Sequence, residues 1–224
     1  MGQYYNPVVK DGNKWRRICF SNDEYGFIGW KLMEHSDCRN PLILNIEKYL
    51  LNNPLPLVWC GDYSNASQYD EEYRKNFAEE YEQSVKEHHL VEDDIYEAAW
   101  GSTYEIPLSE VMSDEEEEKF LTGLFLINDT KKSYIPLKEY EEAARNTYGY
   151  STSPLSLLTA AGNGQGGGDY HETYPNYDMV GYWMGDTIRT SYELPEGYTN
   201  CLNNDYIFVE GKLVKEPEGW DFEI

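Results

Sequence analysis

The sequence predicts an α+β fold in which two pseudo-symmetric halves share one domain, residues 1–224, around antiparallel sheet. Three observations lead to this prediction: one order of segments occurs twice, β-hairpin signals recur along the chain, and aromatic residues are plentiful. The 21 Tyr, 6 Trp and 7 Phe give an aromatic content that disordered chains lack. A chain of 224 residues is also long enough to bury a substantial core within one domain.

The N-terminal segment predicts a β-hairpin. Val8 to Lys10 and Lys14 to Arg16 flank Asp11-Gly12-Asn13. Glycine supplies the positive φ that tight hairpin turns require. We therefore expect two antiparallel strands at the start of the chain.

Two predicted helices begin with the same signature, a polar N-cap residue followed by proline. Asn40-Pro41 opens the first helix and Ser153-Pro154 opens the second. Asn and Ser side chains accept a hydrogen bond from the first turn, and the N–H that proline lacks would be unpaired there anyway. Apolar residues recur at helical spacing in the first segment; these are Leu42, Ile43, Ile46, Tyr49 and Leu50.

Each predicted helix is followed by an apolar segment that contains tryptophan and ends in Gly-Asp. These segments, Val58 to Asp62 and Val180 to Asp186, are expected to be strands. A hairpin then closes each copy, over residues 124–137 and 206–215. The recurrence of a capped helix, a Trp strand and a hairpin predicts an internal repeat.

The two halves, 1–137 and 138–224, differ in two places, and function is expected there. The first half contains an acidic insert, residues 69–118, and the second contains a Gly-rich loop, residues 162–169. The insert has 18 Asp and Glu residues but only 3 Lys and Arg, so it accounts for most of the net charge of −23.

This charge argues against a surface that binds nucleic acid or anionic lipid by itself, and it favours a basic host protein as partner. The four cysteines lack CxxC spacing, and no apolar run approaches the roughly 18 residues of a membrane span. We therefore expect a cytoplasmic protein with reduced thiols and no membrane contact.

The acidic insert is interpreted as an electrostatic docking surface. Its candidate partner-binding residues are Glu92, Asp93, Asp94, Glu115, Glu116, Glu117 and Glu118. A run of like charges is also typical of a plain solvated face. In addition, Ser113 and Glu116 have the spacing of a capping box, so part of the run has a local reason. Both interpretations stay open.

The Gly-rich loop is the candidate site for a small anionic ligand. Its candidate ligand-binding residues are Gly164, Gly166, Gly167, Gly168, Asp169 and His171. The N–H groups of such a backbone can converge into a nest for phosphate or carboxylate. A Walker motif is excluded because the loop contains no lysine. A helix C-cap followed by an ordinary surface loop explains the same glycines.

The two Gly-Asp corners suggest a site for a divalent cation. Asp62, Asp169 and Asp186 could hold Mg²⁺ or Ca²⁺ if the corners converge, because these ions prefer oxygen ligands. Gly and Asp are equally ordinary turn residues at strand ends. No G-x-S-x-G motif or papain-like cysteine context is present, so no catalytic residue is assigned.

Five blocks of sequence resemble a group of acidic proteins found in phages and bacteria. The blocks are Met1 to Pro7, Lys31 to Ser36, Trp59 to Tyr63, Gly162 to Asp169 and Val180 to Asp186. The similarity spans most of the chain outside the acidic insert. It implies a small accessory protein that binds host or defence components, and it carries over no catalytic residue.

Two hypotheses of function follow. In the first, the protein is non-enzymatic and acts as a phage accessory protein or counter-defence inhibitor, docking its acidic face on a basic host protein. In the second, the Gly-rich loop binds or hydrolyses a nucleotide or another small anionic ligand, with a divalent cation to offset the negative charge. The sequence favours the first hypothesis and leaves open whether the protein is an enzyme.

Overall fold

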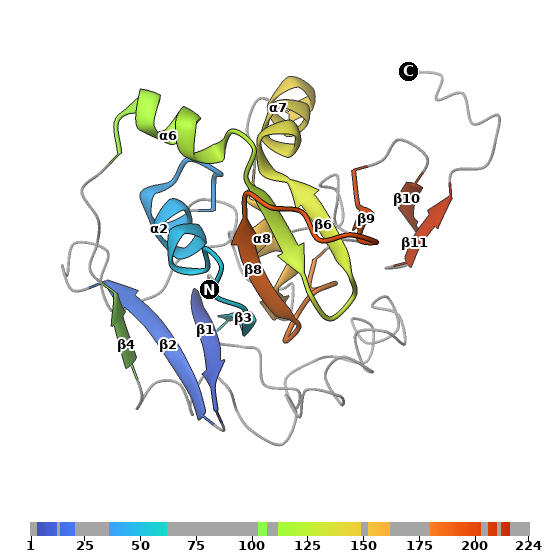
Figure 1. Ribbon diagram of the computed structural model, residues 1–224. Coiled ribbons are helices and arrows are strands. Elements are labelled where there is room, and N and C mark those ends of the chain that lie inside the picture. The colour runs from blue at the N-terminus through green and yellow to red at the C-terminus, as the bar shows by residue number, and fades with distance from the viewer. Residues whose placement is uncertain are drawn as a thin grey trace.

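The computed structural model combines helices with a mostly antiparallel sheet, which confirms the predicted α+β class (Figure 1). It describes residues 4–12, 14–20, 36–61, 103–106, 112–148, 152–161, 180–202, 206–209 and 212–215.

Nine of the described strands form one sheet. Their bounds are β1 (Tyr5–Asp11), β2 (Lys14–Phe20), β3 (Leu55–Gly61), β4 (Thr103–Ile106), β5 (Phe125–Asn128), β6 (Ser133–Pro136), β7 (Ala160–Ala161), β8 (Thr187–Ser191) and β9 (Thr199–Asn200). The order across the sheet is β4-β2-β1-β3-β8-β5-β6-β9, and β7 pairs with β3. Two further strands, β10 (Tyr206–Val209) and β11 (Lys212–Lys215), form a hairpin of their own.

The predicted hairpins are confirmed at the level of strand pairing. β1 pairs antiparallel with β2, with Asp11 opposite Lys14, and Gly12 between them has φ +59°. β5 likewise pairs antiparallel with β6. The β1–β2 pairing follows from short-range turn chemistry, because a two-residue connection with positive φ matches the twist of the flanking strands. Four residues, 129–132, connect β5 to β6.

Both predicted N-caps are also present. Helix α2 (Pro41–Tyr49) follows Asn40, whose side chain accepts a hydrogen bond from the Leu42 N–H at 2.9 Å. Helix α8 (Pro154–Leu158) follows Ser153, whose hydroxyl accepts from the Leu155 N–H at 3.1 Å. The remaining described helices are α6 (Asp114–Leu121) and α7 (Leu137–Tyr148).

The second Trp segment corrects one prediction. Residues 180–186 form turns rather than a strand, and β8 begins only at Thr187. The reason lies in Gly181 and Gly185, which have φ of +76° and +78°; a strand cannot adopt this backbone. Trp183 is completely buried in these turns, and its backbone N–H donates a hydrogen bond to the Leu158 carbonyl at 2.7 Å. The internal repeat as a whole stays a prediction.

β3 lies in the middle of the sheet and is buried on both faces. Successive side chains of a strand point to opposite faces. Leu57 and Trp59 accordingly join the main core with α2 and α8, whereas Val58 and Cys60 join a smaller cluster that includes Met184. The sheet is therefore covered on both sides at this strand.

β3 also connects the two halves of the chain. Leu55 pairs with Ile188 of β8, and Trp59 pairs with Ala160 of β7. The Trp59 N–H donates to the Thr159 carbonyl at 2.8 Å. Residues from both halves thus complete one sheet.

Two features relate to the predicted cellular location of the protein, namely the burial of the cysteines and the length of the helices. Cys38, Cys60 and Cys201 are buried and free of disulfides. Burial raises the pKa of the Cys201 thiol to about 11, which keeps it protonated and unreactive at neutral pH. None of the described helices has both the length and the apolar character to cross a membrane. A cytoplasmic location stays a prediction.

Candidate functional site

The acidic run 114–118 forms most of α6, and a capping box starts this helix as predicted. The Ser113 N–H donates to Glu116 Oε2 at 2.8 Å, and the Glu116 N–H donates to Ser113 Oγ at 3.4 Å. The hydrogen bonds that the Glu116 carboxylate accepts, first from the Ser113 backbone N–H and then from the Ser113 hydroxyl at 2.8 Å, lower the pKa of this carboxyl. Carboxylates in a first turn also complement the positive end of the helix dipole.

Arg39 attaches α6 to the body of the protein. Its guanidinium donates to both carboxylate oxygens of Glu141 in α7, at 2.5 and 3.0 Å, and to Glu118 Oε2 at 2.7 Å. Glu141 is only 1% exposed, so this fork compensates a carboxylate that is almost fully removed from water. The hydrogen bond that Arg39 donates to Glu141, followed by the one that it donates to Glu118, raises the Arg39 pKa further above its ordinary value.

Lys138, in the first turn of α7, makes the second attachment. Its ammonium lies 2.8 Å from Glu118 Oε2 and 3.4 Å from Glu141 Oε2. The hydrogen bonds from Lys138 and then Arg39 lower the pKa of Glu118. Glu117 is nearly buried, and desolvation raises its pKa although Arg39 lies 3.9 Å away. A network of two cations and three carboxylates therefore fixes α6 against α7.

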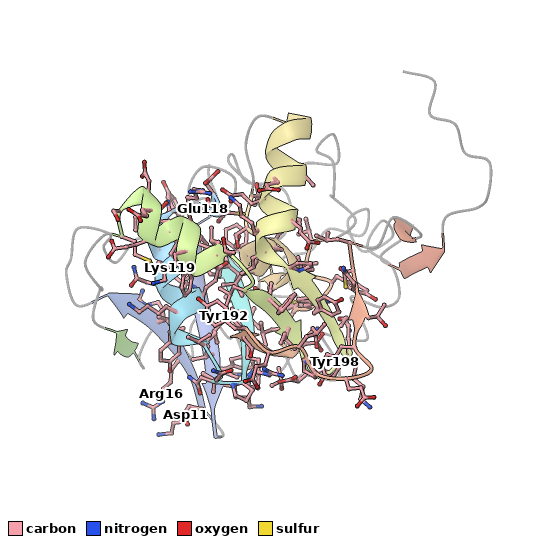
Figure 2. All side chains as sticks on the ribbon, turned by 45° about the horizontal axis from the view of Figure 1, so that its top comes forward. Asp11, Arg16, Glu118, Lys119, Tyr192 and Tyr198 are labelled. Atoms are coloured by element: carbon pink, nitrogen blue, oxygen red, sulfur yellow. The ribbon has the colours of Figure 1, made fainter. Side chains whose placement is uncertain are left out.

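The carboxylates of the run thus differ in their partners. Glu116 serves the cap, while Glu117 and Glu118 face Arg39. Asp114 and Glu115 are exposed and are the members of the run that remain for a partner (Figure 2 labels Glu118 and Lys119 of the same helix). The other candidate partner-binding residues lie outside the described residues; these are Glu92, Asp93 and Asp94.

Asp186 is the one candidate cation ligand within the described residues. Its carboxylate is 1% exposed, accepts a hydrogen bond from Asn128 Nδ2 at 2.8 Å and lies 3.3 Å from the Lys131 ammonium. Lys131 in turn lies 5.2 Å from the centre of the Tyr182 ring. These contacts give Asp186 a structural role in joining the 180–186 turns to the β5–β6 loop.

A cation site is not assembled by the described part of the chain. No group of three or more His, Cys, Asp or Glu side chains there could hold a metal ion. Asp62 and Asp169, the other two candidate ligands, lie outside the described residues. The same applies to the candidate residues of the Gly-rich loop, which are Gly164, Gly166, Gly167, Gly168, Asp169 and His171.

Glu47 is a buried acid that the sequence reading missed. It is 1% exposed in α2, its Oε1 lies 3.5 Å from the Ser153 hydroxyl, and its Oε2 has no hydrogen-bond partner among the described residues. Burial raises its pKa from 4.5 to about 8, with a smaller contribution from the charge of Glu141. The helical spacing of the sequence indicates this burial, because Glu47 lies four residues after Ile43 and therefore on the same, core-facing side of the helix.

Comparison with known proteins gave no match to a family model, a curated protein or a solved structure. Function is therefore argued from the residues of this chain.

Proposed function

We propose that this protein is a non-enzymatic interaction protein that docks on a basic protein through the carboxylates of α6 and the rest of the acidic insert. The observation that supports it is the attachment of α6 by Arg39 and Lys138. These contacts use Glu117 and Glu118 and leave Asp114 and Glu115 exposed on an anchored helix.

An anchored helix suits electrostatic docking for two reasons. Carboxylates on a fixed backbone lose little conformational freedom when a partner binds, so less of the interaction energy is spent on ordering. A net charge of −23 also attracts a basic partner from a distance and raises the association rate. The exposed acids then occupy positions that nucleic-acid phosphates would otherwise take on such a partner.

The test compares two charge reversals in affinity capture from a bacterial lysate at low and high salt. Glu115→Lys reverses an exposed charge of α6. Asp11→Lys is the matched control, because Asp11 is exposed in the β1–β2 turn at the opposite end of the molecule (Figures 1 and 2). Asp11→Lys breaks a surface contact of 3.5 Å with Arg16, and such pairs contribute little.

We expect Glu115→Lys to weaken capture of basic proteins about tenfold, because a like-charge contact at an exposed position costs about 1.4 kcal/mol. Asp11→Lys should bind as the unmodified protein does. High salt should release the captured proteins, since it screens exposed charges. Equal capture by all three proteins, or capture that persists at high salt, would count against the proposal.

A further inference from the structure

Two large apolar side chains of the described residues are exposed, and they lie two positions apart in one loop. Tyr192 is 46% exposed and Leu194 is 41% exposed, both in the β8–β9 connection. A single exposed apolar residue is normal on any protein surface. Tyr192 and Leu194 are the two exposed large hydrophobic side chains of the described residues, and their occurrence in one loop distinguishes this loop.

Side-chain hydrogen bonds hold this loop at both ends. The Tyr192 hydroxyl donates to the Phe120 carbonyl at 2.9 Å, in the last turn of α6. At the other end, the Tyr198 hydroxyl donates to Asp129 Oδ1 at 3.0 Å. Asp129 also accepts a hydrogen bond at 2.9 Å from Arg189, which lies in β8 before the loop. The Tyr192 end of the loop is therefore fixed beside α6, whereas the Tyr198 end lies away from this helix, as the labelled residues in Figure 2 show.

The residues between the two anchors suit a partner with a defined chemistry. Leu194 precedes Pro195, which fixes its own φ and restricts Leu194 to extended backbone. Glu193 and Glu196 lie on either side and are exposed. The loop thus presents an apolar side chain between two carboxylates.

We infer that the Tyr192–Gly197 loop is the central contact of the docking surface. Leu194 and the exposed edge of Tyr192 pack against an apolar side chain of the partner, and Glu193 and Glu196 pair with Lys or Arg residues on either side of it. This inference rests on the proposed function and names the segment that the basic partner must carry. Binding energy commonly concentrates in such a small apolar centre with a charged rim, and a pre-ordered loop reduces the entropic cost.

The test uses a display library of random peptides, selected on the unmodified protein. Binding of the selected peptides is then measured for Leu194→Ser and for the double variant Glu193→Gln/Glu196→Gln. The matched control is Glu139→Gln/Glu142→Gln, which removes two exposed charges from α7. Thermal unfolding of each variant checks that the fold is intact, which is expected because all five side chains are exposed.

We expect the selected peptides to share an apolar residue flanked by Lys or Arg. Leu194→Ser and Glu193→Gln/Glu196→Gln should each weaken their binding about tenfold, whereas the α7 control should not. Basic peptides that bind Leu194→Ser as well as the unmodified protein would overturn this inference and leave the proposed function standing. Selected peptides without a basic residue, or no peptides at all, would count against both.

Discussion

The Ser153 hydroxyl lies 3.5 Å from the buried carboxylate of Glu47, so the N-cap of α8 faces the side chain of α2. Ser153 also donates its backbone N–H to the Ser36 carbonyl and accepts from the Leu155 N–H. The two helices that begin with the same signature are therefore joined at a polar point inside the core. We expect the Glu47 carboxyl at this contact to cause the largest pH dependence of the free energy of unfolding.

Glu47→Gln should remove much of that pH dependence. The folded carboxyl has a pKa of about 8 and the unfolded one about 4.5, so between these values the folded state holds a proton that the unfolded state has released. The free energy of unfolding therefore falls as the pH rises through this window, by about 3 kcal/mol between about pH 5 and pH 8. Gln cannot ionise, and urea unfolding across this range should show a flatter profile.

The control for this prediction is Glu115→Gln, which removes an exposed carboxyl. It should keep the decline of the unmodified protein. A Glu47→Gln variant that loses stability with pH as steeply as the unmodified protein would show that the Glu47 carboxyl ionises normally in the folded state.

Arg39→Met should destabilise the protein by about 3 kcal/mol, because it leaves the buried Glu141 carboxylate without its bidentate partner. Adding Glu141→Gln should restore part of the loss, since an uncharged amide costs less to bury. Lys119→Met removes the same charge from an exposed position of α6 and is expected to change stability little. Chemical unfolding of the three variants gives the comparison; equal losses for Arg39→Met and Lys119→Met would contradict the network.

Asp186→Ala should lower the free energy of unfolding by about 3 kcal/mol, because the buried Asn128 amide loses its acceptor and Lys131 its counter-charge. We expect the same loss with and without Mg²⁺ or Ca²⁺. A loss that appears only in the presence of one of these ions would instead support the cation site expected at the Gly-Asp corners.

Ser113→Ala should cost about 1 kcal/mol through loss of the capping box of α6. Ser113→Asn retains a side-chain acceptor and should recover most of this loss. Hydrogen exchange of the α6 amides provides a local readout, because an uncapped first turn frays more readily. If the α6 amides of Ser113→Ala exchange as slowly as those of the unmodified protein, the cap contributes nothing.

The parts of the fold that sequence could predict are those set by near neighbours. The caps at Asn40, Ser113 and Ser153 depend on residues two or three positions away, and all three were correct. The prediction of a strand at 180–186 was wrong. It followed the apolar composition of the segment, whereas the positive φ of Gly181 and Gly185 turns the chain.

The candidate site was harder to predict because its contacts are remote in sequence. The acidity of residues 114–118 is evident from the sequence. Arg39 and Lys138, which are distant in the chain, decide which of these carboxylates form ion pairs. Arg39 and Glu141 are far apart along the chain, and no local pattern pairs them. No local pattern distinguishes Tyr192 and Leu194, because the ends of their loop are held by Phe120 and Asp129, which are distant in the chain.

The pairing of Leu55 with Ile188 also has a consequence for synthesis on the ribosome. β3 leaves the ribosome well before β8, its neighbour in the sheet, because the two strands are far apart along the chain. Until β8 emerges, part of this apolar central strand has no partner on one side and is open to chaperones or to wrong pairing. We therefore expect the fold to close after translation of β8, and slowly, as is usual for sheets with distant strand pairs.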